Sequence, residues 1–289
     1  MAAEALPIKP SKHDEYDFIS PSSGTKDAAA GKSVLVTGAG SGIGEEIALY
    51  FAIAGATSVT LAGRDIVSLE ETKARIQTEY PKVHLLCVAT DITDSKAVSK
   101  LFEKAGKVDI LINNAGSTGT VAPLADTDIV KWWTAFDINI RGTYLVTIEY
   151  LKLLKGGSGS VVNVSSRSSH VTAPSMSAYQ ISKSALNRLT EFIDKDYASQ
   201  GVTSVAYHPG GVPGTKVADS APEWLRKTFK DSAALPAATA VFLTTPRAKY
   251  LSGRFVSAQW DLEELEQYKD RIISGDLLKM RCLGIDDHL

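Results

Sequence analysis

Tyr179 and Lys183 lie four residues apart in the stretch Tyr-Gln-Ile-Ser-Lys. Within a helix, this spacing places the phenol and the ammonium on one face. A free phenol has a pKa of about 10, and a nearby positive charge favours its ionised form. The pair could therefore move a proton to or from an alcohol oxygen near neutral pH. Because this spacing alone is common, a simple surface pair is the alternative.

Two further polar residues could serve the same chemistry. Ser166 follows an apolar run at residues 160–164 that predicts a strand, so its hydroxyl could bond the same substrate oxygen; it could also be an ordinary loop serine. Asn139 lies within residues 128–155, which otherwise predict a long helix. Asparagine is a poor residue for a helix interior, which indicates a local kink or a specific hydrogen bond, with a surface asparagine as the alternative.

A glycine turn stands near the start of the chain, where residues 33–44 read Ser-Val-Leu-Val-Thr-Gly-Ala-Gly-Ser-Gly-Ile-Gly. An apolar strand precedes the glycines, and a helix with acidic residues in its first turn follows at residues 45–51. This geometry places a dinucleotide pyrophosphate on the free N–H groups of a helix N-terminus. Because the spacing differs from the common G-x-G-x-x-G fingerprint, a purely structural turn is the alternative.

Strand and helix patterns alternate from Lys32 onward, which predicts a single-domain α/β fold: a doubly wound parallel sheet with helices on both faces. Ligands of such sheets bind at the carboxyl ends of the strands, where the polar motifs of this chain fall. The predicted strands are 34–36, 59–62, 83–89, 108–112, 160–164, 202–207 and 254–258, and the predicted helices are 45–51, 66–80, 95–105, 128–155, 176–199 and 237–243.

Composition narrows the class of protein. The 289 residues are 44% hydrophobic and 22% charged, which is ordinary for a globular domain. The net charge of −2 gives no reason to expect a nucleic-acid partner, and no apolar run approaches the roughly 20 residues that cross a bilayer. Residues 1–10 lack a signal-peptide core, and the two cysteines lie far apart. We expect a cytoplasmic protein without a membrane or metal partner.

The ends of the chain lie outside this pattern. Residues 1–30 are predicted to form an irregular N-terminal extension. It is either a mobile tail or a segment docked by its apolar side chains, Tyr16, Phe18 and Ile19. Residues 31–289 are predicted to form the dinucleotide-binding and catalytic domain, which includes a C-terminal tail from about residue 260.

Six motifs together resemble the short-chain dehydrogenase/reductase family in order and spacing, over about residues 32–212. The resemblance implies a Rossmann-type fold and a nicotinamide cofactor. Stretches near the two ends, Tyr16 to Pro21 and Tyr250 to Arg254 with Trp260-Asp261, look more loosely like fungal members. The six motifs are Thr37-Gly38-x-x-x-Gly42-x-Gly44, Asn113-Asn114-Ala115-Gly116, Asn139, Ser166, Tyr179-x-x-x-Lys183 and Pro209-Gly210.

The resemblance implies a role for each of four catalytic residues. Tyr179 is the general acid/base, and Lys183 lowers its pKa and binds the nicotinamide ribose. Ser166 positions the substrate oxygen, and Asn139 holds a water in the proton relay. In the reducing direction, a hydride goes to a carbonyl carbon while Tyr179 protonates the oxygen.

The same resemblance implies contacts to the cofactor. Asp91 would hydrogen-bond the adenine with Ile92 beside it, although Asp91 could also be a turn residue before a helix. Asn114 would line the ribose region. The predicted cofactor-binding residues are Gly38, Ser41, Gly42, Ile43, Gly44, Arg64, Asp91, Ile92, Asn114, Tyr179, Lys183, Val212 and Thr215.

The choice of cofactor can be argued from charge. An acid at the end of the second strand would bond a ribose 2′-hydroxyl and repel a 2′-phosphate, and this chain has Gly63 there. Arg64 follows, and a guanidinium can bind a phosphate through two hydrogen bonds. NADP(H) is therefore favoured over NAD(H). Asp65 argues the other way, although a residue two places beyond the strand can point aside.

One motif departs from the family pattern P-G-x-V-x-T, whose threonine touches the carboxamide. Here Val212 is followed by Pro213 and Gly214, and the threonine comes one place later, at Thr215. Thr215 could still make this contact if the loop bulges. Residues 211–235 could form a mobile lid over a substrate pocket, or an ordinary surface connection.

The sequence as a whole predicts an NADP(H)-dependent oxidoreductase that acts on a small-molecule ketone or secondary alcohol, in fungal secondary metabolism. We expect a homodimer or homotetramer, held together by the helices predicted at 128–155 and 176–199. Two alternatives remain open. One is a redox-neutral epimerase or dehydratase on the same fold, and the other is a non-catalytic dinucleotide-binding regulatory protein.

Overall fold

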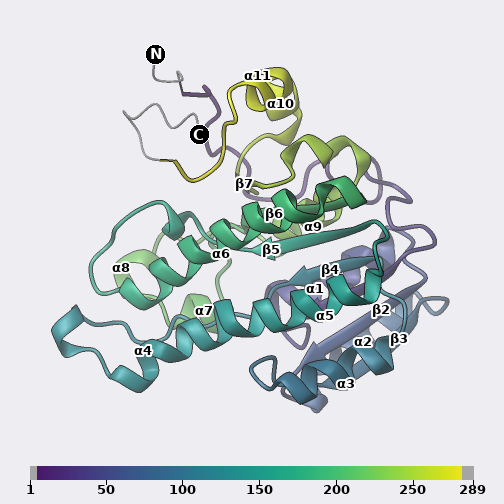
Figure 1. Cartoon of the computed structure of the whole chain (residues 1–289), viewed down its shortest axis with the longest axis horizontal. Coiled ribbons are helices and arrows are strands. Elements are labelled where there is room, and N and C mark those ends of the chain that lie inside the picture. Colours follow the sequence, from purple (N-terminus) through teal and green to yellow (C-terminus); the bar gives the residue numbers. More distant parts are fainter. Residues whose placement is uncertain (1–4, 282–289) are drawn as a thin grey trace.

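The computed structural model describes residues 5–281, and their strands form one sheet of seven parallel strands (Figure 1). The strand order is β3-β2-β1-β4-β5-β6-β7, so the direction of winding reverses between β1 and β4. The predicted doubly wound α/β fold is confirmed. The strands are β1 (Ser33–Thr37), β2 (Ser58–Gly63), β3 (His84–Ala89), β4 (Ile110–Asn113), β5 (Gly159–Val164), β6 (Val202–His208) and β7 (Arg254–Ser257).

Helices cover both faces of the sheet, because successive strand residues point to opposite sides. On β1, Val34 and Val36 pack with α1 and α9, while Leu35 packs with α3 and α5. Helix α2 lies on the α1 face, and α6 lies on the α3 face. These helices are α1 (Gly42–Ile53), α2 (Ile66–Glu79), α3 (Ser95–Ala105), α5 (Thr143–Leu154), α6 (Ser177–Tyr197) and α9 (Ala234–Leu243).

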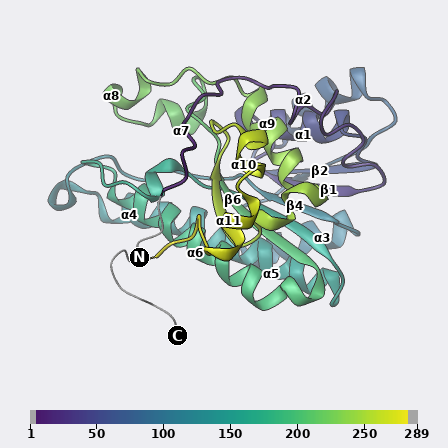
Figure 2. The same ribbon diagram turned by 90° about the horizontal axis from the view of Figure 1, so that it is seen from above.

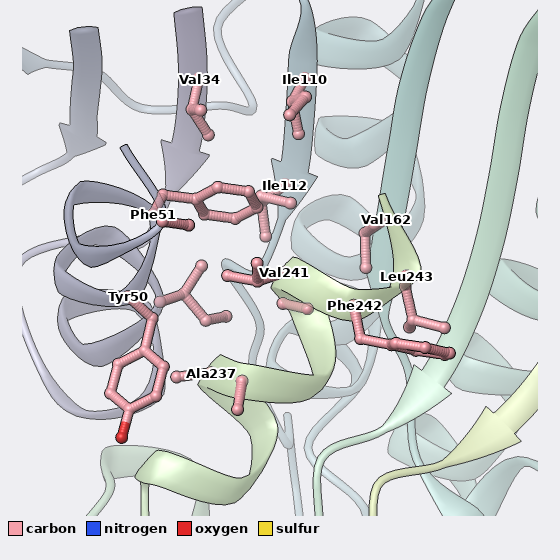
Figure 3. Packing of buried hydrophobic residues seen from close by; sticks show 14 of the residues in the cluster. Val34, Tyr50, Phe51, Ile110, Ile112, Val162, Ala237, Val241, Phe242 and Leu243 are labelled. Carbon is pink, nitrogen blue, oxygen red and sulfur yellow. The ribbon is translucent and has the colours of Figure 1, made fainter. Parts of the chain in front are cut away.

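The larger part of the core lies between the sheet, α1 and α9 (Figure 3). Phe51 of α1 and Phe242 of α9 are fully buried against strand residues such as Ile112 and Val162. Burial of one such side chain contributes roughly 1.5–3 kcal/mol to folding. This core packs along the strands up to residues such as Val36 and Val164 near their carboxyl ends, so it fixes those ends in place for binding.

The long helix predicted at residues 128–155 has a widened turn in its middle. Helix α4 (Ile129–Phe136) passes into a π-helical segment, Asp137–Gly142, before α5 begins. At Gly142 an added Cβ would lie 2.7 Å from Ile92, so only glycine allows this close approach. The local irregularity expected at Asn139 therefore takes the form of a π-helical turn.

The N-terminal extension packs on the domain, although residues 5–29 form no helix or strand. Ile19 is fully buried in the core, and the Phe18 ring lies 5.4 Å from that of Phe242. Figure 2 shows this segment in purple, and in that view it overlaps α7 (Lys216–Asp219) before it reaches β1. The short helices α10 (Leu262–Glu266) and α11 (Lys269–Ser274) follow β7, and α8 (Glu223–Arg226) follows α7.

The remainder of the predicted C-terminal tail, residues 282–289, lies outside the described residues. Within residues 5–281, none of the helices has the length and apolar character required to span a membrane.

Candidate active site

A cavity of about 1030 Å³ opens at the carboxyl ends of the strands from β1 to β6. Its size is at the upper end of the range for ligand pockets. Three predicted site residues, Asn139, Ser166 and Val212, are not among its lining residues. The predicted residues that do line it are Gly38, Ser41, Gly42, Ile43, Gly44, Arg64, Asp91, Ile92, Asn114, Tyr179, Lys183 and Thr215.

The glycine turn forms one wall of this cavity and fits a pyrophosphate. Gly38 has φ +67°, and a Cβ on Gly44 would lie 2.2 Å from the carbonyl oxygen of Gly38, so both positions require glycine. Ser41 precedes α1 without capping it through its side chain. The first N–H groups of α1 therefore stay available to an anion at the positive end of the helix.

Thr37 and Asn114 connect the turn to the neighbouring strand. The Thr37 hydroxyl accepts hydrogen bonds from the N–H groups of Asn114 and Ala115, at 3.0 and 3.2 Å. The Asn114 amide donates to the carbonyl oxygens of Thr37 and Gly38, at 3.0 and 3.2 Å. These bonds fix the ends of β1 and β4 at the point where the winding of the sheet reverses.

Charged residues gather at the end of the cavity near β2 and β3. Arg64 is exposed, and its charge helps to lower the pKa of Asp91, after the larger effect of hydrogen bonds from Thr93. Asp65 caps α2, since it accepts from the N–H of Val67 at 3.0 Å and from the hydroxyl of Ser68 at 2.5 Å. Asp91 likewise accepts from both the N–H and the hydroxyl of Thr93. Asp91 thus combines the predicted turn role with a place on the cavity wall.

Tyr179 and Lys183 come from the first two turns of α6, and Ser166 from the end of β5. Lys183 Nζ donates to the carbonyl oxygen of Val164 at 2.7 Å, and it lies 5.8 Å from the centre of the Tyr179 ring. The Ser166 side chain is close enough to the Tyr179 hydroxyl to lower the pKa of that phenol. All three side chains are buried, so the structure brings the predicted acid/base, cation and serine together.

Burial dominates the protonation of this group. It raises the pKa of Tyr179, and the hydrogen bond from Ser166 only partly opposes this rise. Burial also lowers the pKa of Lys183 to about 8. Within residues 5–281, no carboxylate forms an ion pair with Lys183. The helical pair alone predicts a lowered tyrosine pKa, whereas loss of solvation raises it in the ligand-free chain.

Asn139 is fully buried and supports the loop after β4. Its amide donates to the carbonyl oxygen of Ser117 at 2.8 Å and to the hydroxyl of Ser182 at 2.9 Å. Its oxygen accepts from the N–H of Ser117, also at 2.8 Å. The π-helical turn therefore points this side chain between the loop and α6, which explains an asparagine in the middle of a helix.

The loop that carries Ser166 is held by a buried network that sequence reasoning missed. Asn187 on α6 donates to the hydroxyl of Ser169 at 2.8 Å and accepts from that of Ser165 at 2.6 Å. The Ser169 hydroxyl in turn donates to the carbonyl oxygen of Ser166 at 2.6 Å. The position of Asn187, one helical turn after Lys183, is a signal that could have revealed it.

The loop after β6 lies against the glycine turn. Thr215 Cγ2 would be 3.1 Å from a Cβ on Gly42, so Thr215 faces the region prepared for the phosphates. Its hydroxyl donates to the carbonyl oxygen of Val212 at 3.2 Å and caps α7. Val212 is buried behind the cavity wall. Lining residues that the sequence did not single out include Thr90, Thr134, Asp137, Ile138, Ser165, Lys216 and Val217.

Comparison with known proteins identifies similar sequences. The family model for short chain dehydrogenases matches residues 32–226. The chain is 40% identical over 284 residues to the short chain dehydrogenase citE of Monascus ruber, which covers 96% of each chain. It is 33% identical over 281 residues to the short chain dehydrogenase andI of Emericella variicolor, covering 94% of this chain and 95% of the relative.

Two solved structures of 26% sequence identity each have a TM-score of 0.73. One is a 7α-hydroxysteroid dehydrogenase in complex with NADH and 7-oxo glycochenodeoxycholic acid, and the match covers 81% of this chain and 94% of that one. The other is a short chain dehydrogenase from Shigella flexneri in complex with NADP, with 81% and 100% coverage. Since these equally similar structures hold different cofactors, the cofactor of this chain must be argued from its own residues.

Proposed function

The chain belongs to the short chain dehydrogenase family, and on that premise we propose that it is an NADP(H)-dependent oxidoreductase that reduces a ketone to a secondary alcohol. The observation that carries the proposal is the buried group of Ser166, Tyr179 and Lys183 beside a cavity with an uncapped helix N-terminus. When bound, the nicotinamide supplies the hydride that reaches the carbonyl carbon.

Side chains of this protein donate the proton that the reduction requires. A carbonyl oxygen between Ser166 and Tyr179 accepts a hydrogen bond from each hydroxyl. Because burial raises the pKa of Tyr179, the phenol holds its proton at neutral pH and gives it up as negative charge develops on the substrate oxygen. Lys183, held by the carbonyl of Val164, stabilises the phenolate that remains. Asn139 holds the nearby loop and the water proposed for proton resupply.

Three features support NADP(H). Gly63 places no acid at the end of β2. Asp65, the nearest carboxylate, is engaged in capping α2. Arg64 is exposed on the cavity wall, where it can bind a 2′-phosphate, and Lys216 adds a second positive charge on the opposite loop, close enough to lower the pKa of Asp65.

Arg64→Ala is expected to raise KM for NADPH by about ten- to hundred-fold, since a hydrogen bond to a charged group contributes roughly 1.5–3 kcal/mol. KM for NADH should hardly change. The matched control is Arg75→Ala on α2, because Arg75 pairs with Glu45 and Glu46 outside the cavity. Equal losses with both cofactors, or a similar loss in the control, would refute a 2′-phosphate contact.

The fungal relatives support a proposal for the substrate class. Similarity over nearly the whole chain to short chain dehydrogenases of Monascus and Emericella supports a role in fungal secondary metabolism, with a polyketide-derived ketone as the substrate. The test is NADPH oxidation against a panel of ketones and quinones, with product analysis. We expect one alcohol for each NADPH consumed. Products formed without cofactor oxidation would favour an epimerase or dehydratase, and NADPH binding without any turnover would favour a regulatory protein. The expected cytoplasmic location stays a prediction.

A homodimer or homotetramer is supported by exposed apolar side chains on three neighbouring helices. Sedimentation should give a mass of at least two 30.9 kDa chains, and Phe192→Glu should shift the equilibrium towards the monomer. A wild-type mass of one chain at micromolar concentration would contradict the proposal. The side chains are Ile129, Val130 and Trp133 of α4, Tyr144 of α5, and Ile181 and Phe192 of α6.

A further inference from the structure

The segment after β6 closes on itself. We call residues 211–231 the lid segment; it contains α7 and α8, and its residues 214–217 line the cavity. At its base, the N–H of Asp231 donates to the carbonyl oxygen of Gly211 at 3.0 Å. The N–H of Gly211 donates back to Asp231 Oδ2 at 2.6 Å. The two ends of the lid segment are therefore fastened to each other by a pair of hydrogen bonds.

The close contact between the two ends of the lid segment requires glycine at two consecutive positions, 210 and 211. Gly210 has φ +95°, and an added Cβ would lie 2.6 Å from Asp231 Oδ2. A Cβ on Gly211 would lie 2.4 Å from Cδ1 of Phe229. A side chain at either position would collide with Phe229 or Asp231, where the lid segment returns to its base. The two consecutive glycines of this loop therefore have a packing cause.

The Asp231 carboxylate also binds His13 of the N-terminal extension and Gln259, which follows β7. Only 1% of its side chain is exposed, and its Oδ2 accepts from Gln259 Nε2 at 2.8 Å. Its Oδ1 lies 2.6 Å from Nδ1 of His13, in the N-terminal extension. A buried carboxylate is costly unless donors surround it, so each of these partners matters. His13 is held in turn, because its carbonyl oxygen accepts from the N–H of Ser232 at 2.9 Å.

The extension approaches this base from outside the residues that the family model matches. The family model begins at residue 32, and the two solved structures cover 81% of the chain. The citE relative, in contrast, matches over 96% of the chain. The contacts of His13 with Asp231 and Ser232 place the extension at the end of the lid segment. His13 thus lies where the extension can act on the cavity wall.

We propose that the N-terminal extension helps to position the wall of the active-site cavity. His13 holds Asp231, and Asp231 fixes the base of the lid segment. Residues 214–217 therefore keep their place on the cavity wall. Both residues are positioning residues. The kinetic part of this proposal rests on the proposed function, whereas the position of the lid segment does not.

Limited trypsin digestion of the ligand-free full-length protein tests the position of the lid segment. The lid segment offers cleavage sites at Lys216, Arg226, Lys227 and Lys230. His13→Ala should speed cleavage within it by about tenfold or more, since it removes a charge-assisted hydrogen bond. The melting temperature should fall only modestly, because the Asp231 carboxylate keeps its hydrogen bonds from Gly211 and Gln259.

Two further variants separate positioning from general loosening. His13→Asn should restore slow cleavage, because an asparagine amide can donate to Asp231 from nearly the same point. Lys12→Ala should cleave like wild type, because Lys12 pairs with Asp261 at 2.9 Å and does not touch the base of the lid segment. Unchanged cleavage in His13→Ala, equal acceleration in Lys12→Ala, or no rescue by His13→Asn would each overturn the proposal.

NADPH affinity and kinetics give the functional readout. His13→Ala should weaken NADPH binding and raise KM several-fold while kcat falls less, because the reacting groups on α6 and β5 stay in place. Unchanged NADPH affinity alongside faster cleavage would overturn the link to the site. If wild type reduced no ketone, the proposed function would fail, whereas proteolysis and NADPH binding would still decide this proposal.

Discussion

Tyr179→Phe lowers kcat/KM for ketone reduction by about 10²- to 10⁴-fold, the range that loss of a general acid produces. The variant loses only the phenolic hydroxyl, and the ring keeps its buried place on α6. NADPH binding, measured by fluorescence titration, should therefore stay close to wild type. Single-turnover kinetics would show the loss in the chemical step.

The matched control for this variant is Tyr150→Phe. The Tyr150 hydroxyl donates to the carbonyl oxygen of Asp109 at 2.7 Å and accepts from the N–H of Ser160 at 3.0 Å, at the opposite ends of the strands. Loss of the Tyr150 hydroxyl should lower the free energy of unfolding by about 1–3 kcal/mol and leave the chemistry intact. If Tyr179→Phe were as active as Tyr150→Phe, Tyr179 would not be the proton donor.

Lys183→Met has two opposite effects, on activity and on stability. Activity should fall by roughly 10²- to 10³-fold, as for loss of one electrostatic donor in an enclosed site. Stability should rise at neutral pH, because methionine of similar length fills the site without a buried charge. This combination distinguishes a functional lysine from a structural one.

The pH dependence of that stability gain follows from the shifted pKa. Burial lowers the pKa of Lys183 from 10.5 in the unfolded chain to about 8 in the folded one. Below pH 8 the amine is charged in both states, and burying it destabilises the fold by up to about 3 kcal/mol. Between pH 8 and 10.5 the unfolded state binds more protons, so wild-type stability rises with pH.

The gain of Lys183→Met over wild type should therefore be largest below pH 8 and shrink as pH rises above it. Urea denaturation of the ligand-free protein at several pH values measures this difference. Lys195→Met serves as the control, since Lys195 is an exposed residue of the same helix. If the stability gain of Lys183→Met stayed constant from pH 7 to pH 10, the buried Lys183 ammonium would not be what destabilises the wild-type fold.

Local patterns predicted most of the elements. The apolar runs that form β1, β2 and β5 are short and have clear ends in the sequence. Helix α3 begins and ends at the predicted residues, Ser95 and Ala105. The family match over residues 32–226 confirms the resemblance that six motifs indicated. Glycines, asparagines and the Tyr-Lys pair sit at strand ends, so their convergence follows from the parallel sheet.

Long-range contacts could not be predicted in this way. His13 and Asp231 are 218 residues apart, and no local pattern marks either as the partner of the other. The protonation of Tyr179 also depends on burial by the whole fold, which reverses the shift that its neighbour on the helix suggests. Asn139 in the π-helical turn bonds to Ser117 and Ser182, which are distant from it in the sequence.

The most direct test of the central claim uses NADPH that carries deuterium at the transferable position of nicotinamide C4. The purified protein is incubated with the ketone that it turns over fastest, and the product is examined by mass spectrometry and NMR. We predict an alcohol with one deuterium on the carbinol carbon, from wild type and from Tyr150→Phe. A product without deuterium at that carbon, or the absence of any reduced ketone, would contradict the account.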